Sequence, residues 1–240
     1  MRSKRITALG LLAIVSLTAC SEVNEIVDQI VPPEEQAELL LDAAVLEVVL
    51  PMAFLTDVVW DVFGQTPATS FLGISCPDTN GVCNASGDVT CTVDASNLVF
   101  DFDVCGVAAD GRTVLIDGGL SVATVSPTDL SIALAALSFN AGVGLNGTLT
   151  ADLSTCDFGW NITSGSSTTA TGEITMCSED YPASGSSLQI TVDVTEETWI
   201  FGFAFDGTST VDVTVTRDGS PVATCETDLD SFQSLCTAPE

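Results

Sequence analysis

The side chains of this chain that could carry chemistry are its cysteines and its carboxylates, because other reactive side chains are scarce. The sequence has 9 Cys, 33 Asp and Glu, and no His. Lys4 is the single Lys, and Tyr181 is the single Tyr. His is the commonest general base, and Lys and Tyr are among its usual replacements. The composition therefore argues against an active site built on a nucleophile and a base, and we expect no catalytic activity.

The first cysteine follows a segment that is typical of export signals. Arg2, Lys4 and Arg5 form a basic start, and the apolar stretch 6–17 that follows is too short to span a bilayer. The run Leu17-Thr18-Ala19-Cys20 then resembles a bacterial lipobox, with a branched apolar residue, two small residues and the obligatory Cys. An ordinary signal peptide with a chance Cys near its end is the alternative.

The lipobox resemblance implies that residues 1–19 are a signal peptide and that Cys20 is the site of lipidation. Cys20 would carry a diacylglycerol, and its new N-terminus would be acylated, for instance with palmitate. Several acyl chains anchor a protein stably, whereas one does not. Ser21 follows Cys20 where an Asp would suggest retention in the inner membrane. We therefore expect a lipoprotein of the outer membrane that faces the periplasm or the cell surface.

Eight cysteines remain once Cys20 is set aside, and an even number in an exported protein predicts disulfide bonds. The short spacings favour Cys76–Cys83 and Cys225–Cys236, and the other connectivities stay open. Without His or a CxxC pair, a zinc site is disfavoured. The disulfide candidates are Cys76, Cys83, Cys91, Cys105, Cys156, Cys177, Cys225 and Cys236.

The carboxylates offer no spacing that stands out. With 33 acids, chance pairs are expected, so a carboxylate hydrolase is only a distant alternative. The loop CPDTNGVCNASGD presents Asp78, Asn80, Asn84 and Asp88 as possible calcium ligands, but it lacks the EF-hand pattern. A turn rich in Asx residues explains the same composition. We therefore predict no metal site and no cofactor.

The charge excludes one class of partner. The formal net charge is −28, and the basic residues that follow the signal segment are Arg112 and Arg217. Nucleic-acid binding depends on Lys and Arg that neutralise phosphates, so we expect none. A solvated acidic surface is the simple explanation of this charge, and a cation-binding surface is the alternative.

Two helical stretches are predicted before the strands begin. Apolar residues in 22–31 recur with helical spacing, and Pro32-Pro33 ends that helix. A second helix is expected from Glu34 to Phe63, kinked or divided at Pro51. Residues 39–50 are apolar around nearly the whole circumference, which indicates burial against a sheet, with a helix that contacts a lipid or a partner as the alternative.

The C-terminal region predicts a four-stranded meander. Its first two strands alternate over 188–194 and 199–205, with Val194 opposite Trp199 across a Thr-Glu-Glu-Thr loop. Asp218-Gly219 predicts a tight turn that sets Val222 opposite Val215. Pro221 argues that this last segment is an edge strand.

The central region predicts similar but looser hairpins. A turn at 94–97 would place Val93 opposite Leu98, and a change of parity predicts a bulge near Ala136. A hairpin with Cys156 opposite Cys177 conflicts with the apolar alternation unless Gly172 forms a bulge.

These observations predict one α+β domain. Its N-terminal helices would pack on a long, twisted, mostly antiparallel sheet of meanders and hairpins stapled by disulfides. The expected division is a signal peptide 1–19, a lipid-anchored segment 20–33, and a single domain 34–240 that is helical over 34–64 and β-rich over 69–240. This resembles the β-rich outer-membrane lipoproteins of Gram-negative bacteria.

The function expected from these features is that of a structural or interaction protein of the cell envelope. It would be held by its lipid and would contact an envelope protein, and the sequence does not give its oligomeric state. The alternative is a carrier that binds an apolar ligand between helix and sheet, motivated by the apolar stretch 39–63.

Overall fold

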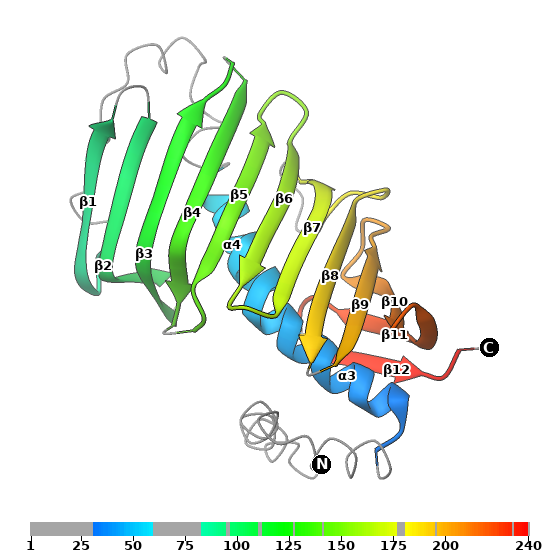
Figure 1. Ribbon diagram of the computed structural model, residues 1–240. Helices are drawn as coiled ribbons and strands as arrows, with labels where there is room; N and C mark the ends of the chain where they lie inside the picture. The colour runs from blue at the N-terminus through cyan, green and yellow to red at the C-terminus, as the bar shows by residue number, and fades with distance from the viewer. Residues whose placement is uncertain are drawn as a thin grey trace.

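The computed structural model describes residues 31–59, 83–94, 97–109, 112–126, 128–140, 142–176, 181–194, 196–231 and 233–239. Twelve strands in these ranges form one antiparallel sheet whose spatial order is the chain order, β1 to β12. Figure 1 shows this meander as a long twisted sheet with the helical segment crossing one face. The strands are β1 Ser86–Asp94, β2 Asn97–Ala109, β3 Arg112–Thr124, β4 Asp129–Phe139, β5 Leu145–Asp152, β6 Asp157–Ser164, β7 Thr168–Thr175, β8 Ser187–Val194, β9 Glu197–Ala204, β10 Thr210–Arg217, β11 Ser220–Asp228 and β12 Gln233–Thr237.

One face of the sheet is apolar because alternate residues of every strand point to it. Paired residues on this inner face form an unbroken row through all twelve strands. From β3 onward, the side chains of this row are buried, and Gly172 of β7 is half-buried. The row consists of Val93, Leu98, Val122, Ile132, Leu149, Trp160, Gly172, Leu188, Phe203, Val213, Cys225 and Cys236.

A single helical segment lies against this inner face. It consists of α3 Pro33–Ala44, the π-helical turn η1 Val45–Val49, and α4 Leu50–Val59. The π turn ends at Val49, two residues before Pro51, and the Leu50 N–H donates to the Val45 carbonyl across five residues. A proline has no N–H and clashes with the preceding turn, so the wider turn lets the helix continue past it. The expected interruption at Pro51 is therefore a local widening.

The α+β prediction is wrong. The described residues form one long antiparallel sheet with a single helical segment, so no layer of helices faces the sheet. The predicted first helix, 22–31, lies almost wholly outside the described residues. Apolar periodicity located the helical segment 33–59. It did not show that, in the described part of the chain, this segment alone would pack on the sheet in place of a layer of several helices.

The C-terminal meander is present, but its registers differ from the prediction. Val192, rather than Val194, lies opposite Trp199, because the strands pair up to Val194 and Glu197 and the connection is two residues shorter than expected. Ala223, rather than Val222, lies opposite Val215, because the register shifts beside Pro221. The strand β11 is not the last strand of the sheet, because β12 pairs with its residues Thr224–Asp228, but Pro221 lies beyond the end of that pairing, where β11 has no strand on its outer side.

The central hairpins agree better with the sequence. Val93 pairs with Leu98 as predicted. The register of β4 and β5 shifts between Leu134 and Leu137, and Ala136 has a positive φ of 52°, so the predicted bulge is confirmed.

The hairpin that follows Cys156 has its own register. Phe158 pairs with Ile174 and Trp160 pairs with Gly172, one residue away from the register that sets Cys156 opposite Cys177. Both sets of apolar side chains therefore share the inner face, and no bulge at Gly172 is needed.

Gly172 provides a direct test of strand packing. A Cβ atom on Gly172 would lie 2.3 Å from the Ser187 carbonyl oxygen of β8, so we expect Gly172→Ala to destabilise the fold by about 1–3 kcal/mol. Gly119→Ala is the matched control, because its Cβ would meet nothing closer than 3.6 Å. The control should be neutral or slightly stabilising. Urea unfolding of both variants measures this, and equal midpoints would contradict the packing of β7 against β8.

Candidate functional site at the helix–strand seam

The described cysteines are disulfide-bonded, and they tie strands of the sheet together. Cys83 bonds to Cys105 at the start of the sheet, and Cys225 bonds to Cys236 across β11 and β12. The second bond was predicted, whereas the predicted Cys76–Cys83 bond is wrong because Cys83 has another partner. Cys91 and Cys156 are also disulfide-bonded. Cys20, Cys76 and Cys177 lie outside the described residues.

The strand β12 ends the sheet, and its backbone has a definite polarity. Cys225 and Cys236 are directly opposite, with Cα atoms 4.0 Å apart. This short separation is typical of a pair that exchanges no hydrogen bonds between its strands. The N–H groups of Cys236 and of Ser234, two residues earlier, therefore point away from β11. An edge strand with such outward donors normally leaves them to water or to another chain.

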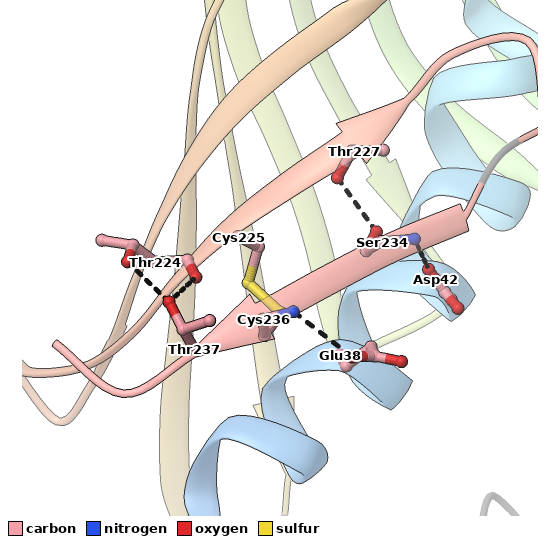
Figure 2. Close-up of a disulfide and its surroundings, with 8 residues drawn as sticks. All are labelled: Glu38, Asp42, Thr224, Cys225, Thr227, Ser234, Cys236 and Thr237. Carbon is pink, nitrogen blue, oxygen red and sulfur yellow. Dashed lines mark hydrogen bonds between the residues drawn. A yellow bond between two sulfur atoms is a disulfide. The ribbon is translucent and has the colours of Figure 1, made fainter.

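Two carboxylates of α3 accept these outward donors (Figure 2). The Ser234 N–H donates to Asp42 Oδ1 over 3.0 Å, and the Cys236 N–H donates to Glu38 Oε2 over 3.3 Å. Four residues of helix rise about 6 Å, and two residues of strand rise about 6.6 Å. The i, i+4 spacing of the acids therefore matches the i, i+2 spacing of the donors. We call this arrangement, formed by Glu38, Asp42, Ser234 and Cys236, the edge seam.

The electrostatics of the seam centre on Asp42. Burial raises the pKa of Asp42 above its ordinary value, the hydrogen bonds from Ser234 oppose that rise, and the nearby Glu38 charge adds to it. Burial is the largest of these effects, so the charged form of Asp42 is disfavoured at this position. The edge seam therefore gains hydrogen bonds, while burial of Asp42 disfavours the charge on its carboxylate.

A third carboxylate joins the helical segment to the middle of the sheet. Glu47 of η1 accepts a short hydrogen bond from the buried Ser164 hydroxyl of β6. The pair adjoins a pocket of about 50 Å³ between the helical segment and the β4–β5 connection. The contact is best explained as satisfying a buried hydroxyl group.

Carboxylates also order the turns at one end of the sheet. Asp152, Asp206 and Asp228 each accept hydrogen bonds from residues two or three positions later. These hydrogen bonds lower the pKa of each of the three carboxyl groups. Such Asx turns account for the three acids structurally.

The residues considered as possible calcium ligands are only partly described. Asn84 and Asp88 are exposed near the start of β1, and Asp78 and Asn80 lie outside the described residues. Within the described ranges, no group of three or more His, Cys, Asp or Glu side chains is placed to hold a metal ion. Sequence reasoning missed the seam, although Glu38 and Asp42 at i, i+4, on either side of the apolar run 39–41, were its visible signal.

Comparison of the chain with models of protein families, with curated proteins and with solved structures finds no match. None of the helices described is long and apolar enough to cross a membrane.

The raised pKa of Asp42 predicts a specific dependence of stability on pH. The folded state holds the Asp42 proton more tightly than the unfolded state, so this group's contribution to stability is present at low pH and lost as pH rises through the folded pKa. We expect the stability of the wild type relative to Asp42→Asn to increase between pH 7 and pH 4. Urea unfolding of both proteins at each pH measures this difference.

Asp152→Asn is the matched control, with the opposite sign. The pKa of Asp152 is lowered in the folded state, so its contribution is lost as pH falls through that pKa. The advantage of the wild type over this variant should shrink on acidification. If acidification changed the stability difference from the wild type in the same direction for both variants, the environments assigned to Asp42 and Asp152 would be contradicted.

Proposed function

We propose that this chain is a lipid-anchored protein of the cell envelope with a structural or interaction role, held at the outer membrane through Cys20. The observation that supports an interaction role is the outer face of the sheet. Paired residues there form a second row through all twelve strands, and none of them is charged. Its members are Thr92, Val99, Ser121, Ala133, Thr148, Asn161, Thr171, Gln189, Gly202, Thr214, Thr224 and Thr237.

The uncharged row is notable because the chain has a net charge of −28. Most of its side chains are exposed, and threonines dominate it. Exposed acids lie two residues away along the same face at Glu173, Asp212 and Glu226, so the row is a line of hydroxyl and amide groups within an acidic face. An extended, rigid face of this kind suits a protein that displays a surface to a neighbour.

The inner face gives less support to the alternative of an apolar-ligand carrier. Leu41, Val45 and Met52 of the helical segment are fully buried in one cluster with Ile132 and Leu149 of the sheet. The pocket beside Glu47 holds about 50 Å³, whereas ligand sites usually hold about 300–1,000 Å³. Among the described residues, these contacts favour a packed interface over a ligand site.

The anchor is tested by changing the lipidation site. We expect Cys20→Ala to lose the acyl mass from the N-terminal peptide and to leave the outer-membrane fraction. Ser21→Ala should keep both, because it preserves the lipobox. Mass spectrometry of the N-terminal peptide and cell fractionation measure the effect. A wild-type peptide without acyl groups would refute the anchor.

The interaction role is tested by crosslinking in cells from the outer face. A photoreactive residue at Thr171 or Thr214, both exposed in the uncharged row, should capture the same envelope protein. The same residue at Asp218, exposed in the β10–β11 turn, is the control and should not capture it. Capture of no common protein from the two row positions would count against the interaction role.

A further inference from the structure

The strand β12 differs from β1, which begins the described sheet, in how it resists pairing with another chain. The strand β1 carries Asp88 and Asp94, and its register shifts at Gly87, which has a φ of 67°. Charges and bulges are the usual protection of an edge. Residues 233–237 of β12 read QSLCT, with no charged residue, no proline and no residue of positive φ among them. Protection of this edge must therefore come from elsewhere.

An unprotected β12 would favour self-association. Two copies of one edge strand can pair antiparallel about a two-fold axis, so that the same surface serves both partners. Like charges would oppose such pairing in most of this acidic chain, but QSLCT has none. Leu235 adds an apolar side chain that is 69% exposed on the outer face of the same strand. The second copy of the chain is thus the partner that this edge fits best.

We propose that Glu38 and Asp42 guard the β12 edge against strand addition from a second copy of the chain. They accept the N–H groups of Cys236 and Ser234, which are the donors that an incoming strand would need. The acids come from a helical segment nearly 200 residues away in sequence, at separations of 192 and 198 residues. The edge seam therefore forms only when α3 packs against the completed sheet. The edge seam is an autoinhibitory contact that keeps the folded chain monomeric at this edge.

The test compares two double variants of the full chain in the same detergent. Glu38→Ala with Asp42→Ala removes both acceptors, and we expect its average mass to rise with concentration toward twice that of the monomer. Glu38→Gln with Asp42→Asn is the matched control: its amide oxygens can still accept the N–H groups, so it should stay monomeric like the wild type. Sedimentation equilibrium measures the masses, and circular dichroism follows the sheet content.

A third substitution shows whether β12 is the contact. Leu235→Lys places a charge on the edge strand and should return the double-alanine variant to the monomer, because charged edges resist pairing. A folded double-alanine variant that stays monomeric would overturn the proposal. Association that Leu235→Lys does not reverse would also overturn it. Loss of sheet content in the double-alanine variant would overturn it too, because the sheet and the Cys225–Cys236 disulfide should remain when the edge seam is removed.

Discussion

The hydrogen bonds from β12 to Glu38 and Asp42 join the first element of the described fold to its last strand. Every strand of the sheet pairs with its neighbour in sequence, so the sheet itself is built from local contacts. The helical segment is the exception, since α3 packs against β11 and β12 at the far end of the chain. Contacts of long sequence separation cost the most loop entropy. Seating the helical segment is therefore the step that completes the inner core.

Scarcity of cations explains how the acids are used. Only two arginines follow Arg5, and one of them, Arg217, lies 3.6 Å from Glu197 and stacks over Trp199. The carboxylates that are ordered instead accept backbone N–H groups and hydroxyls, at the turns and in the edge seam. Charge-assisted hydrogen bonds of this kind are stronger than neutral ones. An acidic chain can thus be held in one structure without a network of salt bridges.

The sequence predicted local features well and long-range ones poorly. Alternation placed Val93 opposite Leu98 and the bulge at Ala136, because both follow from parity within one hairpin. Registers that depend on the length of a connection, as at Trp199, were wrong by two residues. The edge seam and the Cys83–Cys105 bond join residues that no local pattern relates. The α+β prediction failed for the same reason, since apolar periodicity gives the burial of a helix but not the number of helices.

The most direct measurement of this account is the exchange of the backbone amide hydrogens of β12 in the wild-type chain. Leu235 belongs to the pairs bonded to β11, while Ser234 and Cys236 face α3. Amide exchange resolved by residue should show Ser234 and Cys236 protected to a degree comparable with Leu235. Rapid exchange of both, with Leu235 protected, would contradict the seam and leave β12 an open edge.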